Sequence, residues 1–251
     1  MRNLRQYIRS VLSDDPYIRF QALFQAIRDS RLYGEPEPFI DYNKLAVDIS
    51  DHYEYETPLM SFVPTTYDTF EDYFLRKLSQ NQVEDCQRNC AESIVCAPAE
   101  ATVDSFTNDD KKIILKNSVV KFADLLLPEG YTPIHFRLRI CDYHWVHSPV
   151  DGIVSSVEYY DHNEISEGSD SLCLIKIRSQ HGEFGVICVG ECTVQTFVSK
   201  LRPGTRVNKM DVLGYFYFGS RVVLLLPPKM VHHSAEGQKY FPGDPVIVPG
   251  R

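Results

Sequence analysis

Hydrophobic residues recur with two different periods along this chain. Before residue 79 they lie three or four positions apart, which is typical of helices with one apolar face. Three such stripes are Leu4, Ile8, Val11 and Leu12; Phe20, Leu23, Phe24 and Ile27; and Tyr67, Phe70, Phe74 and Leu78. Asp15-Pro16 matches a helix N-cap followed by proline at the first helical position, and Gly34–Pro38 interrupts the helical pattern as a linker.

After residue 90 the period shortens. Runs of valine, isoleucine and aromatic residues alternate with turn-forming clusters, which is typical of antiparallel strands. The runs predicted as strands are Ser93–Cys96, Lys112–Leu115, Gly152–Tyr159, Ser171–Ile177, Phe184–Val189, Val212–Phe218 and Val222–Leu226. We therefore expect an α+β protein. A helical N-terminal region, residues 1–85, would pack on an antiparallel, β-rich and sandwich-like domain, residues 90–251.

Composition excludes several classes of protein. The 251 residues carry a net charge of −8, which disfavours a general nucleic-acid role because phosphate contacts require a basic surface. No apolar run approaches the roughly 20 residues of a membrane span, and no secretory signal opens the chain. Seven cysteines, an odd number, indicate free thiols in a reducing compartment. We therefore expect a cytoplasmic protein.

The first 31 residues differ in charge from the rest. Six arginines against three aspartates give them a net charge of +3, whereas the remainder carries −11. A basic amphipathic helix pair can lie on an anionic membrane surface, which would place the protein peripherally on the inner face of a membrane. Such helices more often pack on their own domain. The residues leave both possibilities open and favour the second.

Two apolar runs meet at Gly219-Ser220, within Lys209–Leu226. One interpretation is a hairpin, because glycine suits the first central position of a type II′ turn. The other is a peptide bond that breaks itself. The Ser220 hydroxyl would attack the Gly219 carbonyl carbon to give an ester, and β-elimination followed by hydrolysis would leave a pyruvoyl group on residue 220. These residues alone favour the hairpin.

Three longer motifs change that preference. The segment around the dipeptide resembles the maturation site of the phosphatidylserine decarboxylase family, and two other segments resemble that family's motifs in the same order. The matching residues are Lys209, Gly214, Phe216, Gly219 and Ser220, with the segments Phe136–Gly152 and Tyr67–Leu78. Weaker matches are Ala97–Ala101, Leu115–Leu126 and Val189–Glu191. The chain therefore resembles this family from about residue 67 onward.

The resemblance implies a self-processing decarboxylase. The chain would be cleaved between Gly219 and Ser220, and the pyruvoyl group derived from Ser220 would serve as the cofactor, with no external one. Its ketone would form a Schiff base with the substrate amine, and loss of CO2 would convert phosphatidylserine to phosphatidylethanolamine. The family also implies a homodimer. Partly apolar walls are expected from three aromatic residues, Trp145, Tyr215 and Phe218.

His144 and His147 carry the next expectation. The spacing Cys141-x2-His144-x2-His147 suggests a zinc site, but no fourth ligand lies near in sequence, so we expect no bound metal. A buried, hydrogen-bonded pair beside Trp145 would explain the histidines structurally. The family resemblance instead implies that His147 is the base for maturation and catalysis, with His144 nearby in the pocket. Histidine suits that role because its ordinary pKa is about 6.5.

Two departures from the family pattern concern Glu100 and Arg221. The resemblance aligns Glu100 with an aspartate that orients the histidine base, in the manner of a serine–histidine–acid triad. An exposed glutamate with no role is an equal alternative, and Asp151 could also supply the acid. Arg221 replaces the threonine that usually follows the serine. Its guanidinium could hold a carboxylate or phosphate, or it could face solvent from a strand.

Three functions remain open from the sequence. The first is a decarboxylase acting on phosphatidylserine at a membrane surface. The second is a soluble decarboxylase with the same chemistry that takes a free or carrier-bound amino acid. The third is an uncleaved, non-catalytic family member that binds a ligand or partner. The acidic body of the chain and substitutions beside the site, such as Arg221, motivate the second, and the substitutions at Glu100 and Arg221 motivate the third.

Overall fold

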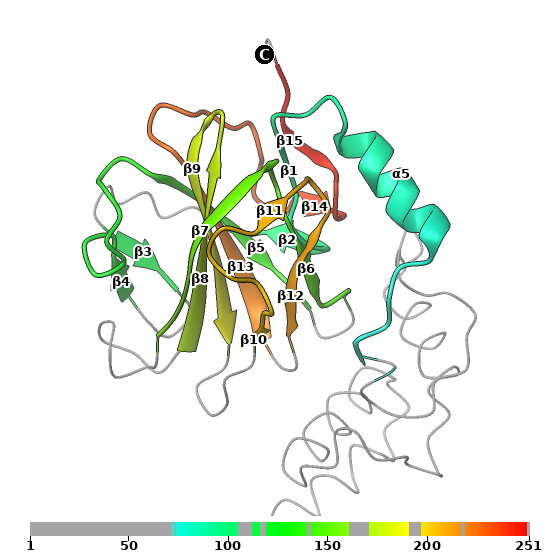
Figure 1. Cartoon of the computed structure of the whole chain (residues 1–251), viewed down its shortest axis with the longest axis horizontal. Coiled ribbons are helices and arrows are strands. Elements are labelled where there is room, and N and C mark those ends of the chain that lie inside the picture. Colours follow the sequence, from blue (N-terminus) through cyan, green and yellow to red (C-terminus); the bar gives the residue numbers. More distant parts are fainter. Residues whose placement is uncertain are drawn as a thin grey trace, which may run out of the picture. The chain divides into compact units, whose positions relative to one another are not determined.

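The computed structural model describes residues 72, 74–104, 112–115, 119–139, 142–160, 171–190, 197–216 and 219–249 (Figure 1). The chain divides into two compact units, residues 1–79 and 80–251. The two helices expected before residue 31 and the linker at Gly34–Pro38 lie outside the described residues. The second unit holds all the strands given below.

The described residues of this second unit form one helix and fifteen short or medium strands. The helix is α5, Gln80–Cys90. The strands are β1 Val95–Cys96, β2 Ala101–Val103, β3 Lys112–Ile114, β4 Val119–Lys121, β5 Thr132–Arg137, β6 Trp145–His147, β7 Gly152–Tyr160, β8 Ser171–Ser179, β9 Gly182–Gly190, β10 Phe197–Val198, β11 Arg206–Val207, β12 Val212–Phe216, β13 Gly219–Leu226, β14 Lys239–Tyr240 and β15 Pro245–Ile247. The predicted β-rich architecture is confirmed, since each of the seven predicted runs overlaps one of these strands.

An eight-stranded antiparallel sheet, in the order β11-β7-β8-β9-β13-β5-β2-β14, forms the centre of the unit (Figure 1). A three-stranded sheet, β10-β12-β6, and two strand pairs, β1-β15 and β3-β4, accompany it. Strand β13 lies inside the large sheet, with β9 on one side and β5 on the other. The residues that follow the predicted cleavage bond are therefore held by backbone hydrogen bonds on both sides.

Strand β13 is apolar at consecutive positions because both of its faces are buried. Val222 and Leu224 join a hydrophobic core with residues of the three-stranded sheet, among them Phe216. Val223 and Leu225 point the opposite way, into a second core. That second core contains Ile113, Val120, Phe122, Leu125 and Leu127, from β3, β4 and the turn after them. The large sheet thus separates two hydrophobic layers.

Three details differ from the sequence predictions. The helix expected over Tyr67–Leu78 includes helical Asp72 and Phe74 among the described residues, but residues 76–79 have no regular structure. Helix α5 was not predicted, because it buries only Cys86 and Cys90 and lacks an apolar stripe. The runs on either side of Gly219-Ser220 do not pair as a hairpin, since β12 and β13 belong to different sheets.

Five of the seven cysteines lie among the described residues, and all five are free and buried, which agrees with the predicted free thiols. They are Cys86, Cys90, Cys96, Cys173 and Cys188. Within the part of the chain that the structure describes, no helix has the length and apolar character needed to cross a membrane.

Candidate active site

Strands β6 and β12 bring the histidine motif beside the segment that leads to Gly219-Ser220. Tyr215 lies opposite Trp145 in the register, and their rings are 4.8 Å apart between centroids. The Phe216 backbone N–H donates to the His144 carbonyl over 3.0 Å. Gly214 permits this close pairing, because a Cβ atom there would lie 2.4 Å from both Phe197 Cζ and the Val198 carbonyl oxygen.

The His147 ring is buried and held at both nitrogens. Its Nδ1 lies 2.8 Å from the Met210 carbonyl oxygen, which can only accept, so Nδ1 carries the proton. The Tyr143 hydroxyl therefore donates to Nε2, at 3.0 Å. The two rings stack with an interplanar angle of 13°. Burial lowers the pKa of His147 to about 4, so the imidazole is neutral at pH 7 and offers the Nε2 lone pair as a base.

The Met210 carbonyl is positioned by an unusual turn. Met210 has a φ of 72°, a left-handed conformation that non-glycine residues seldom adopt. Its backbone N–H donates to the Ser148 carbonyl at 3.0 Å. The preceding residue, Lys209, donates from Nζ to the carbonyls of Cys90 and Ser93, each over 2.6 Å. This family-motif lysine therefore fixes the turn against the end of α5.

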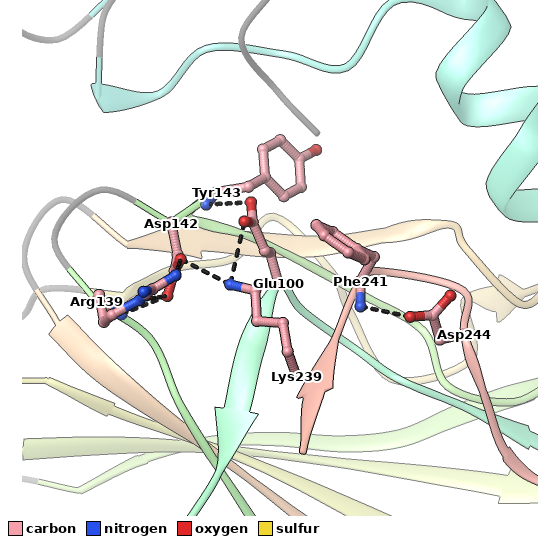
Figure 2. Close-up of polar contacts among 7 residues, drawn as sticks. All are labelled: Glu100, Arg139, Asp142, Tyr143, Lys239, Phe241 and Asp244. Atoms are coloured by element: carbon pink, nitrogen blue, oxygen red, sulfur yellow. Dashed lines mark hydrogen bonds and ion pairs between the residues drawn. The ribbon is translucent and has the colours of Figure 1, made fainter. Parts of the chain in front are cut away.

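Glu100 lies at the opposite end of Tyr143 from His147. Its carboxylate is fully buried, and Oε2 accepts from the Tyr143 backbone N–H at 2.9 Å. Oε1 is 3.1 Å from Lys239 Nζ. Figure 2 shows the Glu100 carboxylate between these two partners. The alternative of an exposed glutamate with no role is therefore wrong, because Glu100 is buried and hydrogen-bonded. Its connection to His147 runs through Tyr143 and not through a direct contact.

Lys239 joins Glu100 to a second buried carboxylate (Figure 2). Its Nζ lies 2.8 Å from Asp142 Oδ1, and Arg139 Nη2 contacts the same oxygen at 2.7 Å. Burial raises the pKa of Asp142, but hydrogen bonds from Arg139 and the charge of Lys239 outweigh it and leave that pKa below its usual value. Arg139 and Lys239 therefore favour the ionised form of Asp142, and Lys239 also forms an ion pair with Glu100.

Asp151, the other candidate acid, has a different contact. Its Oδ1 accepts from the Lys209 backbone N–H at 2.7 Å, and its side chain is exposed. Since both ring nitrogens of His147 are bonded to Tyr143 and Met210, neither faces Asp151. Asp151 supports the turn that carries Met210.

Ser220 lies at an irregularity of strand β13. Gly219 pairs with Gly190 and Arg221 with Val189, so the register shifts across Ser220. An extra residue of this kind distorts the local backbone, and such bulges often accompany active sites. The irregularity lies at the residue on which the sequence predicts a pyruvoyl group. The side chain of Ser220 and all of Phe218 lie outside the described residues.

Arg221 is largely buried rather than solvent-facing. Its Nη2 lies 2.7 Å from Asp104 Oδ2, and its side chain is 15% exposed. His144 is also buried, at 1% exposure, beneath the strand pairing described above. Within the described residues no three His, Cys, Asp or Glu side chains form a group that could hold a metal ion.

Sequence reasoning missed several residues of this network. Tyr143 could have been noticed, because it stands inside the matched histidine motif. Met210 and Lys239 gave no signal, because one contributes only a backbone carbonyl and the other lies 139 residues from Glu100 in the chain. The structure unites Glu100, Tyr143 and His147 in one chain of contacts.

Comparisons with known proteins identify the family of this chain. The family model described as Phosphatidylserine decarboxylase matches residues 70–248. Phosphatidylserine decarboxylase proenzyme 2 of Komagataella phaffii is 31% identical over 188 residues, which cover 64% of this chain and 18% of that protein. Phosphatidylserine decarboxylase proenzyme of Chlamydia muridarum is 27% identical over 254 residues, covering 88% of this chain and 78% of that protein.

Among solved structures, the crystal structure of cbpa from L. salivarius REN covers 36% of this chain and 52% of its own, at 16% identity and a TM-score of 0.26, too low to establish a shared fold. The family match spans most of the chain and includes the histidine motif, the Lys209–Phe216 segment and Gly219-Ser220. This chain belongs to the phosphatidylserine decarboxylase family.

Proposed function

We propose that this chain is a self-processing, pyruvoyl-dependent carboxy-lyase that converts phosphatidylserine to phosphatidylethanolamine and CO2. The observation that carries the proposal is the neutral His147 imidazole on β6, whose two ring nitrogens are both hydrogen-bonded. It lies next to β12, the strand that leads to Gly219-Ser220. Family membership supports both the chemistry and the substrate.

His147 would be the base of self-cleavage. The Ser220 hydroxyl would pass its proton to the Tyr143 oxygen as Tyr143 gives its own to His147 Nε2. The freed oxygen would attack the Gly219 carbonyl carbon and displace the Ser220 amide nitrogen, which would take the proton back and leave an ester. β-Elimination would then release the Gly219 carboxylate and leave dehydroalanine at residue 220, which water would hydrolyse to the pyruvoyl group and ammonia. Glu100 would act through Tyr143, because its carboxylate fixes the backbone that presents the hydroxyl.

After cleavage, the pyruvoyl carbonyl of residue 220 would supply the electrophile that takes up the substrate amine and the electron pair released with CO2. The chain's own residues would arrange the surroundings. Trp145 and Tyr215, in contact across β6 and β12, would form an aromatic wall with Phe218 that limits water around the carboxylate. His147 would return a proton to the product, and His144 would line the same pocket.

The N-terminal region would bring the site to its substrate. Residues 1–31 carry a net charge of +3, which suits contact with anionic lipid headgroups. In this proposal residues 1–85 are a helical, membrane-contacting region on a catalytic domain formed by residues 90–251, and the active protein is a cytoplasmic homodimer bound peripherally to the membrane. Co-sedimentation with vesicles containing phosphatidylserine tests the contact.

Intact-protein mass spectrometry tests the proposed chemistry. Wild-type protein should give two fragments, one ending at Gly219 and one beginning with a pyruvoyl group at residue 220, whereas Ser220→Ala should remain one chain. A single intact chain in both proteins would instead identify a non-catalytic family member. CO2 release from phosphatidylserine vesicles, compared with free serine, then separates the lipid substrate from a soluble amino acid.

A further inference from the structure

A polar cluster lies on the face of the large sheet that points away from β6 and β12. Arg221 stands opposite Arg137 in the register, and Val223 stands opposite His135. Alternate residues of a strand share a face, so both arginines and His135 lie on the face of Val223, which belongs to the second hydrophobic core. Asp104 joins the row, because its backbone N–H donates to the His135 carbonyl at 2.9 Å.

His135 is the unusual member of this cluster. Its side chain is 1% exposed, and neither ring nitrogen has a hydrogen-bond partner. Buried polar atoms in folded proteins nearly always have partners, since leaving one unpaired destabilises the fold. Burial, and then the charge of Arg221, lower the pKa of His135 to about 4, against an opposing effect of Asp104. A neutral imidazole has one N–H donor to offer a ligand.

Arg221, beside His135, has N–H donors that Asp104 does not use. Asp104 engages only Nη2 of Arg221, although a guanidinium carries five N–H donors. Arg137 lies directly across from Arg221 on the neighbouring strand. Like charges in such a position destabilise a sheet. An oxyanion between them would relieve this repulsion and would accept hydrogen bonds from the guanidinium and from the one N–H of the buried imidazole.

We propose that Arg221 and His135, assisted by Arg137, form the binding site for the phosphate group of the substrate. The proposal rests on the proposed function, because Arg221 directly follows the residue that would carry the pyruvoyl group. A phosphate lies four bonds from the reacting amine of a phosphoserine headgroup, so a substrate held at residue 220 would extend its phosphate around the start of β13 toward Arg221. Arginine binds phosphate through paired, charge-assisted hydrogen bonds.

A carboxylate fits this site less well than a phosphate. The substrate carboxylate is the group to be lost, and an arginine that held it would stabilise the ground state more than the transition state. The phosphate keeps its charge throughout the reaction. An arginine on the phosphate therefore binds the substrate without opposing decarboxylation.

Binding can be tested without turnover in the Ser220→Ala protein labelled with ¹⁵N-histidine. Inorganic phosphate, added at constant ionic strength, should shift the ring resonances of His135 and leave those of His181, in the β8–β9 turn, unchanged. Arg221→Gln should weaken this binding on the order of 10- to 100-fold, the loss of one or two charge-assisted hydrogen bonds. Arg221→Lys should lose less, because it keeps the charge.

Arg206→Gln is the matched control, since Arg206 is exposed on β11 at the far edge of the sheet. Thermal unfolding of each variant confirms that it is folded before its affinity is compared. Unshifted His135 resonances at saturating phosphate, or equal affinity in Arg221→Gln and Arg206→Gln, would overturn the proposal.

Two further ligands distinguish the sources of the phosphate. Dihexanoylphosphatidylserine presents a lipid phosphodiester, and O-phosphoserine presents a soluble monoester. Tighter binding of dihexanoylphosphatidylserine supports a lipid substrate, and tighter binding of O-phosphoserine supports a soluble one. If neither ligand binds, the proposed site is wrong. Because Ser220→Ala cannot process, a failure here is separate from a failure of self-cleavage in the wild-type protein, which the mass spectra report.

Discussion

His147 and His135 are two buried histidines in opposite surroundings. Their side chains are 3% and 1% exposed, and burial lowers the pKa of each to about 4. The chain itself bonds both nitrogens of His147. It bonds neither nitrogen of His135. The same residue type, with similar burial and charge state, is therefore fully partnered on one side of the large sheet and unpartnered on the other.

Hydrogen bonds within the protein orient the His147 ring, whereas none orients the His135 ring. The Met210 carbonyl and the Tyr143 hydroxyl fix the tautomer and direction of the His147 ring before any ligand binds, as a base that acts on the chain itself requires. His135 is placed only by its position on β5. An unpaired buried nitrogen lowers stability, and a ligand from outside the chain would remove that penalty.

Replacing the partnered histidine should have the largest effect. His147→Ala removes the proposed base, so self-cleavage should slow about 10²- to 10⁴-fold, the usual contribution of general-base catalysis. Time-resolved intact mass spectra measure the rate. His181→Ala, at an exposed turn, is the control and should process normally. Equal rates in the two variants would remove His147 from the mechanism.

The strand that faces His147 should also tolerate little change. A Cβ at Gly214 would lie 2.4 Å from the Val198 carbonyl oxygen, a backbone atom that cannot move away cheaply. Gly214→Ala should therefore lower the free energy of unfolding by about 3 kcal/mol or more. Gly204→Ala, with a φ of 91° and no atom within 4 Å, should cost only about 1 kcal/mol. Urea unfolding compares them, and similar losses would contradict the packing argument.

Acid should weaken the fold through both histidines. Each has a folded pKa of about 4, below the ordinary 6.5, so the unfolded chain takes up protons first as pH falls. Stability should therefore decline between pH 6.5 and 4, by about 3 kcal/mol for each histidine. His135→Gln should flatten this decline by about half in urea unfolding at pH 7, 5.5 and 4. An unchanged slope would show that His135 is not buried in its neutral form.

The sequence predicted the strands whose positions are apolar on both faces, such as Val222–Leu226, because consecutive valines and leucines fit a doubly buried strand. It missed β5. That strand alternates Ile134 and Phe136 with the polar His135 and Arg137, and it also holds Pro133, which disfavours strands. Since apolar–polar alternation is itself a strand pattern, Pro133 is the residue that hid this strand.

The sequence predicted the motif residues of the candidate site but not the hydrogen bonds that join them. His147 and Gly219-Ser220 follow from short, ordered motifs. The Glu100–Tyr143–His147 chain does not, because it depends on how β2 and the loop before β6 meet, a contact between residues more than 40 positions apart. Local sequence patterns do not reveal contacts between distant residues. The acidic residue was therefore expected to contact the His147 ring directly.

The smallest expected effect comes from Tyr143→Phe. This change would leave Nε2 of His147 without a hydrogen-bond partner, as both ring nitrogens of His135 are. The hydroxyl that donates to Nε2 is lost, whereas the backbone bond to Glu100 remains. The free energy of unfolding should fall by about 1 kcal/mol. Self-cleavage should slow only about 10-fold, because Ser220 can then pass its proton directly to the freed Nε2 and the loss is equivalent to one neutral hydrogen bond. Because that bond favours the neutral ring, its loss should raise the pKa of His147 and move the acid limb of the processing rate to higher pH.

Tyr131→Phe separates this role from stability alone. Tyr131 donates one hydrogen bond to the Glu183 carbonyl at 2.9 Å and packs in the second core, away from β6. Its loss should lower stability by a similar amount and leave the processing rate and its pH profile unchanged. If both variants process alike, Tyr143 only fills space beside His147, and the proton must pass directly from Ser220 to Nε2. A slowed rate and a shifted acid limb in Tyr143→Phe alone would instead make the hydroxyl a working part of the self-cleavage.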